Sequence, residues 1–144
     1  MKRLTMVSLA AGLLLSPLSQ AAAPKARAPA CPSAEFPAFF AAYADSAALQ
    51  KAFTVYPLAH VLLDHAVQPE PREIKVQLPK AKLSFPLIPS RAERKRAGLA
   101  LRTDEVSAQS AKVSLFKEDT GYQVAYIFRK DGCWKLERKE DRSL

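Results

Sequence analysis

The sequence predicts an α+β domain in which N-terminal helices pack on one face of a curved antiparallel sheet. Residues 33–53 place apolar side chains at helical spacing. Residues 99–140 instead alternate apolar and polar side chains in four segments separated by turn signals. Helices followed by a run of strands indicate α+β rather than alternating βαβ units.

The N-terminus predicts a cleaved signal peptide over residues 1–22. Lys2 and Arg3 precede an apolar run over residues 6–15, and a small-x-small pattern follows at residues 19–21. The run is about ten residues, half of the roughly 20 that span a bilayer. We therefore expect residues 23–30 to be a disordered linker, residues 31–144 to form one domain, and the mature protein to be periplasmic or secreted.

Two short helices are expected next. Ser33 follows Pro32 and suits the N-cap of the first helix, in which Pro37 is tolerated because it falls in the first turn. Asp45 or Ser46 suits the cap of a second helix over residues 47–53. An i, i+3, i+4, i+7 pattern gives the first helix one apolar face, formed by Phe36, Phe39, Phe40 and Tyr43.

The middle of the chain is less regular. Residues 54–58 are expected to be extended, with Pro57 marking an edge or an end, and residues 59–66 fit either a helical turn or a strand. Residues 83–88 contain a proline and predict a short edge element. A half-buried strand is predicted where apolar residues alternate with polar ones, at Ile74, Val76 and Leu78.

A short, basic helix and four strands complete the domain. Ser90 and Glu93 form a capping box, and Gly98 provides a left-handed stop. The predicted strands are 99–105, 111–118, 122–130 and 133–140. Between the last two, Asp131 and Gly132 predict a type I′ turn, in which both positions need positive φ. Large apolar side chains recur at every second position, at Tyr122, Val124, Tyr126, Phe128, Trp134 and Leu136.

Charge and composition exclude several classes of function. The formal charge is +8, but four basic residues precede Cys31, which leaves 18 basic and 14 acidic residues and a net charge of +4. This mildly basic domain gives little reason to expect nucleic-acid binding. With four glycines and no Gly-rich phosphate loop, nucleotide binding is not expected either, and no cofactor is predicted.

The chain has two cysteines, Cys31 and Cys133. Export to an oxidising compartment makes a disulfide between them the expected state. A loop of about 100 residues would then be closed, which the chain-entropy model values at roughly 4–5 kcal/mol as an upper figure. No metal site is predicted, because a zinc site needs more ligands and neither His60 nor His65 has a fitting cysteine spacing.

Two groups of residues resemble an uncharacterised exported bacterial family, domain of unknown function 4348. The first group is Phe36, Phe39, Phe40, Tyr43, Asp45 and Gln50, followed by Tyr56-Pro57-Leu58. The second is Tyr126, Phe128, Gly132, Trp134, Leu136, Glu140, Asp141 and Ser143. The resemblance implies the cone-like fold of nuclear-transport-factor-two-like proteins, whose bent sheet often surrounds a pocket. It does not extend to residues 59–110.

Several polar side chains are candidates for a site in such a pocket. His60 and Asp64 would share a face if their segment is helical, giving a general base with an orienting carboxylate, although a surface pair is the simpler interpretation. Asp45 is a candidate acid or base as well as a candidate helix cap. Three hydroxyls are expected to line the cone and bind a ligand, those of Tyr43, Tyr56 and Tyr126.

The densest charge lies at Arg91, Arg94, Lys95 and Arg96, with Lys80 and Lys82 close by in sequence. Such a run either grips an anionic partner or forms a solvated helix face. No aromatic residue interrupts it, so it offers no platform on which bases could stack.

The function expected from these features is binding without catalysis. The partner would be an unknown protein or an anionic component of the cell envelope, contacted at the cone mouth or the basic helix. Two alternatives remain open. One is a small pocket enzyme of the isomerase or hydrolase type that uses Asp45 or His60, and the other is an immunity or inhibitor protein.

Overall fold

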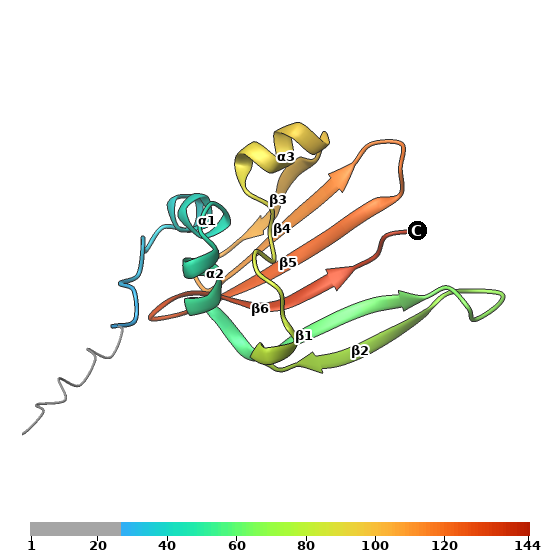
Figure 1. The fold of residues 1–144 in the computed structure, drawn as a ribbon, viewed down its shortest axis with the longest axis horizontal. Coiled ribbons are helices and arrows are strands. Elements are labelled where there is room, and N and C mark those ends of the chain that lie inside the picture. The colour runs from blue at the N-terminus through green and yellow to red at the C-terminus, as the bar shows by residue number, and fades with distance from the viewer. Residues whose placement is uncertain (1–26) are drawn as a thin grey trace, which may run out of the picture.

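The computed structural model describes residues 27–144 (Figure 1). The predicted signal peptide and the first part of the predicted linker lie outside these residues. The elements in chain order are α1 (Phe36–Ala44), α2 (Ala47–Ala52), β1 (Thr54–Asp64), β2 (Arg72–Leu78), the 3₁₀ helix η1 (Lys80–Lys82), α3 (Arg91–Ala97), β3 (Ala100–Val106), β4 (Ser110–Lys117), β5 (Tyr122–Asp131) and β6 (Cys133–Asp141).

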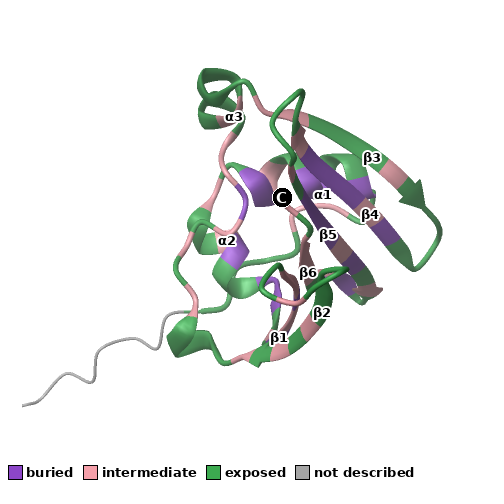
Figure 2. Ribbon diagram, turned by 90° about the vertical axis from the view of Figure 1, so that its right-hand side faces the viewer, coloured by how far each residue is buried: buried purple, intermediate pink, exposed green. Residues whose placement is uncertain are grey.

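The predicted fold class is confirmed: short helices cover one face of a strongly curved six-stranded sheet (Figures 1 and 2). The strand order is β2-β1-β6-β5-β4-β3. Neighbouring strands are antiparallel, with the single exception of β1 and β6, which run parallel. Between β2 and β3 the chain crosses from one edge of the sheet to the other, and these two strands run in the same direction. Three antiparallel pairs then bring β6 beside β1 and parallel to it.

The helix α1 fills the concave side of the sheet with aromatic rings. Phe128 of β5 lies at the centre of this cluster, and its ring centroid is 5.3–6.1 Å from those of Phe36, Phe39, Phe40 and Tyr43. Edge-to-face pairs of this kind contribute about 0.5–1.5 kcal/mol each beyond the area they bury. Pro37 occupies the first turn as expected, but the N-cap is Glu35, whose N–H donates to the Ser33 hydroxyl.

The structure resolves two ambiguous segments of the middle region. Residues 54–64 form one strand, β1, and Pro57 lies where its register against β6 shifts, which suits a residue without an N–H. Residues 83–90, here called the strap, contain no strand, so the expected edge element is wrong. The N–H groups of Leu87 and Ile88 in the strap donate to a side chain, that of Gln50, instead of pairing with a strand.

Gln50 is fully buried, and every hydrogen-bonding position of its amide is used. Its Oε1 accepts from the N–H groups of Leu87 (2.6 Å) and Ile88 (3.1 Å). Its Nε2 donates to the carbonyls of Ala44 (3.2 Å) and Ile88 (2.9 Å). One side chain therefore ties the end of α1 to the strap, and Gln50 and Ile88 are 38 residues apart in sequence.

The hairpin between β5 and β6 departs from the predicted turn. Only Gly132 has positive φ, and the register pairs Asp131 with Cys133 and Lys130 with Trp134, so the turn is centred on Gly132 alone and is not a type I′ turn. This odd spacing has a physical reason. A two-residue turn would place Trp134 on the opposite face from Phe128, whereas the observed register puts both on the core face.

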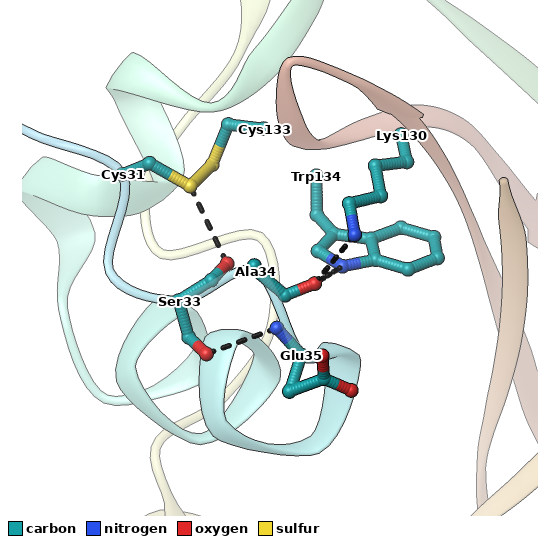
Figure 3. Close-up of a disulfide and its surroundings, with 7 residues drawn as sticks. All are labelled: Cys31, Ser33, Ala34, Glu35, Lys130, Cys133 and Trp134. Atoms are coloured by element: carbon teal, nitrogen blue, oxygen red, sulfur yellow. Dashed lines mark hydrogen bonds between the residues drawn. A yellow bond between two sulfur atoms is a disulfide. The ribbon is translucent and has the colours of Figure 1, made fainter. Parts of the chain in front are cut away.

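A disulfide joins Cys31, just before α1, to Cys133, at the start of β6 (Figure 3). The two Cα atoms are 5.8 Å apart, and 102 residues separate them in sequence. Beside it, the Ala34 carbonyl accepts from the Trp134 indole N–H (3.0 Å) and the Lys130 ammonium (2.8 Å). The predicted tether between the front of α1 and the last hairpin is thus formed.

Replacing both cysteines, Cys31→Ser with Cys133→Ser, should lower the melting temperature. Loss of a cross-link closing about 100 residues costs up to roughly 4–5 kcal/mol in the chain-entropy model. Thermal unfolding followed by circular dichroism would measure the change. Reductant should shift the parent in the same direction and leave the double variant unaffected; equal stability of the two proteins would contradict the tether.

Gln50→Leu should destabilise the domain by about 3 kcal/mol or more, because several buried backbone groups lose their partners at once. Urea unfolding would measure the loss. The matched control is Gln77→Leu on the exposed face of β2, which we expect to change stability by less than about 0.5 kcal/mol. Similar effects of the two substitutions would show that Gln50 does not fasten the strap.

Candidate functional site

The structure does not gather the three candidate tyrosines in one pocket. Tyr43 is fully buried, and its hydroxyl donates to Thr54 Oγ1 (2.9 Å), because the Thr54 proton is used on the Gln50 carbonyl. The Tyr56 hydroxyl donates to the Lys51 carbonyl near the start of β1. Only Tyr126 borders a groove.

All three hydroxyls are engaged within the protein, since that of Tyr126 donates to the Leu87 carbonyl (3.1 Å). Burial raises the pKa of Tyr43 and the pKa of Tyr126 well above the usual range for a phenol. Both side chains are therefore neutral hydrogen-bond donors: Tyr43 holds the Thr54 hydroxyl, and Tyr126 holds a backbone carbonyl. Their aromatic rings pack on the concave side of the sheet, and their hydroxyls are already used within the protein.

Asp45 positions the helix α3. Its Oδ1 accepts from the N–H of Arg91 (2.7 Å), the first residue of α3, whereas α2 is capped by Ser46, which accepts from Leu49 N–H. Asp45 is exposed and lies on the helix side of the domain. Of its two predicted roles, the structure shows capping, but of a helix 46 residues away.

His60 and Asp64 do not form the pair that a helix would bring together. Both lie on β1, where four residues span about 13 Å. Asp64 instead contacts Arg72 across the β1–β2 pair (3.7 Å). His65, outside the strand, lies against the Ser143 carbonyl (3.0 Å).

The actual neighbours of His60 come from β6. The registers place Tyr126, Lys139, His60 and Val76 in one row across four strands of the concave face. The next row holds Val124, Asp141, Leu62 and Ile74. Lys139 and Asp141 face this side because the pairing of β5 with β6 shifts after Leu136, which leaves Glu137 as the extra residue of a bulge.

This setting keeps His60 neutral. Burial lowers the pKa of His60 most, the positive charge of Lys139 lowers it further, and Asp141 opposes both. The His60 Nε2 atom is covered by protein and has no hydrogen-bond partner. A buried polar atom without a partner costs about 1–3 kcal/mol, so the position is not explained by stability.

A groove of about 350 Å³ runs between the strap and α3 on one side and β5 and β6 on the other. Lys139 is its cationic group, and no carboxylate of residues 27–144 lies within ion-pair distance of it. The groove has the size of small ligand sites. It is lined by Pro86, Leu87, Pro89, Glu93, Ala97, Leu99, Tyr122, Tyr126 and Lys139.

The basic helix α3 borders this groove and buries none of its residues. Its ends are fixed as predicted, by the capping box of Ser90 with Glu93 and by Gly98 at φ 65°. Arg94 turns inward, and its Nη1 donates to the Pro89 carbonyl (2.6 Å). Burial lowers the pKa of Arg94. The outward cations of α3 are therefore Arg91, Lys95 and Arg96.

Lys80 and Lys82 do not belong to this surface. They lie on η1, the yellow-green turn beside the start of β1, at the opposite end of the domain from α3 in both views (Figures 1 and 2). Lys117 of β4 takes their place, because it lines a hollow with Lys95 and Gly98. Proximity in sequence was misleading here, since the strap carries the chain across the sheet between η1 and α3.

The described chain shows no metal-binding cluster of three or more His, Cys, Asp or Glu side chains. Within residues 27–144, no helix has the length and hydropathy needed to cross a membrane. The outward cations of α3 form a cationic rim beside a groove lined by aromatic and apolar side chains, one ammonium group (Lys139) and one carboxylate (Glu93). Such an arrangement can hold an anion.

Acidification should weaken the fold through His60. The pKa of His60 is lower in the folded chain than its ordinary value of 6.5, so the unfolded chain takes up the proton first. The contribution of His60 to stability is therefore fully present above about pH 6.5 and is lost as the pH falls toward the folded-state pKa of His60. In urea unfolding at several pH values, His60→Leu should lose less stability on acidification than the parent and be no less stable at neutral pH. His65→Leu is the control; a parent-like pH profile for His60→Leu would contradict this interpretation.

Neither a family model nor a curated protein matches the chain, so the narrower resemblance to domain of unknown function 4348 stays a prediction. Among solved structures, the chain is similar to an NTF2-like protein from Bacteroides fragilis, with a TM-score of 0.56 and 19% sequence identity. The match covers 76% of this chain and 47% of that one, so the chain spans about half the length of its structural neighbour. At this identity the similarity shows the fold alone: a cone-like, NTF2-like α+β arrangement.

Proposed function

We propose that this chain is a binding domain of an oxidising compartment outside the cytoplasm and that it holds an anionic partner on α3. The compartment is supported by the signal-peptide pattern at residues 1–22 and by the disulfide between Cys31 and Cys133. The NTF2-like fold is consistent with a small binding or pocket domain. The fold does not select the partner, so the proposal rests on the site.

The observation that carries the proposal is that α3 is capped at both ends and hydrogen-bonded to the domain, yet contributes no residue to the core. No residue of α3 is buried, although the helix is capped at both ends and anchored by Asp45 and Arg94. In proteins, a helix is usually stabilised by burying an apolar face. The helix α3 buries no residue, and it exposes charged side chains to solvent instead.

The outward cations of α3 form no ion pair within the described chain. Arg91, Lys95 and Arg96 have no carboxylate within ion-pair distance there. Five of the ion pairs in the described chain join two strand residues, and the other two join Arg142, just after β6, to strand carboxylates. These three cations of α3 lie beside a groove that contains Lys139 and Glu93, so the charges of these five groups sum to a positive value.

Binding is favoured over the pocket-enzyme alternative by the state of the candidate catalytic groups. Asp45 is used on a backbone N–H, and the Nε2 of His60 is covered by protein atoms. A general base must reach the proton that it removes. An inhibitor or immunity function is the form that this proposal takes if the anionic partner is an acidic protein.

The test compares two triple variants with the same change of charge. Arg91→Gln, Lys95→Gln and Arg96→Gln remove the rim, while Arg72→Gln, Lys75→Gln and Arg129→Gln remove equally exposed cations on strands. Binding of a fluorescent polyglutamate peptide would be followed by anisotropy at low and high salt. Three exposed charge contacts of about 0.5–1 kcal/mol each predict a loss of roughly tenfold or more for the rim variant alone. Equal losses in the two variants would mean that α3 is only a solvated face.

A further inference from the structure

A second cationic surface lies at the other end of the domain, where lysines are arranged on aromatic rings. The Lys51 ammonium lies 5.7 Å from the ring centroid of Phe85, and the Lys80 ammonium lies 5.2 Å from that of Tyr56. The Tyr56 hydroxyl donates to the Lys51 carbonyl (2.8 Å), which joins the two pairs. We call these four residues, with the neighbouring Lys82 of η1, the lysine–aromatic surface.

This surface is assembled from segments that are distant in sequence. Lys51 belongs to α2, Tyr56 to β1, Lys80 to η1 and Phe85 to the strap. The three lysines are exposed, and the two rings are half-buried. The rings therefore hold the lysine side chains at a fixed place while leaving the ammonium groups in solvent.

The charge of this surface is not compensated within the described chain. No carboxylate of residues 27–144 lies within ion-pair distance of Lys51, Lys80 or Lys82. In Figure 1, α3 lies at the top of the view and η1 at the bottom, with the strap between them. This surface is thus a separate feature, and nothing in the anion binding proposed for α3 depends on it.

The arrangement of rings and charges selects among anionic partners. Each ring has an ammonium over its face, so stacking of a nucleic-acid base or a sugar would have to displace a lysine. The ammonium groups remain exposed, and each half-buried ring keeps part of its apolar surface accessible. Lysines combined with half-buried aromatic side chains suit the headgroup region of a bilayer, where phosphates meet the acyl boundary.

We propose that the lysine–aromatic surface docks the domain on an anionic lipid surface. The contact is peripheral: ammonium groups meet lipid phosphates, and the edges of Tyr56 and Phe85 enter the headgroup layer. Each lysine near an anionic bilayer contributes about 1 kcal/mol, a factor of roughly five in partitioning. Three such lysines predict a change of about a hundredfold.

The experiment measures sedimentation of the full mature chain with vesicles of phosphatidylcholine, with and without phosphatidylglycerol. Binding should require phosphatidylglycerol and weaken with salt. The variant Lys51→Gln, Lys80→Gln and Lys82→Gln should lose about a hundredfold in partitioning. The matched control, Lys75→Gln, Lys112→Gln and Lys135→Gln, removes the same charge from strands and should lose far less.

Two further measurements separate this proposal from its alternatives. Phe85→Ala should weaken vesicle binding without changing the charge, and the rim variant of α3 should bind vesicles much as the parent does. Equal binding to neutral vesicles, or equal losses in the two lysine variants, would overturn the proposal. So would polyglutamate binding that depends on Lys51, Lys80 and Lys82 while vesicle binding does not, because the surface would then fit an acidic protein.

Discussion

The buried amide of Gln50 is the constraint on which the functional side of this domain depends. Without it, the strap would have three more backbone groups to satisfy and no strand to pair with, because β1 and β2 end before it and β3 begins after α3. Once the strap is fixed, its Leu87 carbonyl receives the Tyr126 hydroxyl, and its Pro89 carbonyl receives Arg94. These contacts position both the groove and the basic helix α3. A polar residue in the core thus determines where the surface chemistry is placed.

The segment before α1 is held covalently to the start of β6 by the disulfide. The disulfide and the Ala34 carbonyl fasten the front of α1 to the β5–β6 hairpin, while α1 itself wraps Phe128 in aromatic rings. The far half of the concave face has no such filling. There the bulge at Glu137 turns Lys139 and Asp141 inward, beside a histidine whose Nε2 has no partner. The half packed with aromatic rings stabilises the domain. The polar residues of the other half, His60, Lys139 and Asp141, are not explained by a contribution to stability.

Features coded over a few residues could be predicted from the sequence. The capping box of Ser90 with Glu93, the stop at Gly98 and the aromatic face of α1 each depend on local spacing, and each is present. The hairpin centred on Gly132 was also encoded, because core-facing Phe128 and Trp134 cannot share a face across a two-residue turn. By contrast, the bulge at Glu137 has no composition signal. The contact of Asp45 with Arg91 spans 46 residues and depends on the strap, so the sequence could not place it.

The distribution of charge follows from the same architecture. Strands hold neighbouring side chains on one face at fixed spacing, so several cations of the sheet find carboxylates across or along strands, as Arg129 does with Glu137. The helices α3 and η1 have no such neighbours. Their lysines and arginines are therefore left unpaired at the two ends of the molecule, on α3 and around η1. A net charge of only +4 is in this way converted into two strongly cationic ends, which the average charge of the domain conceals.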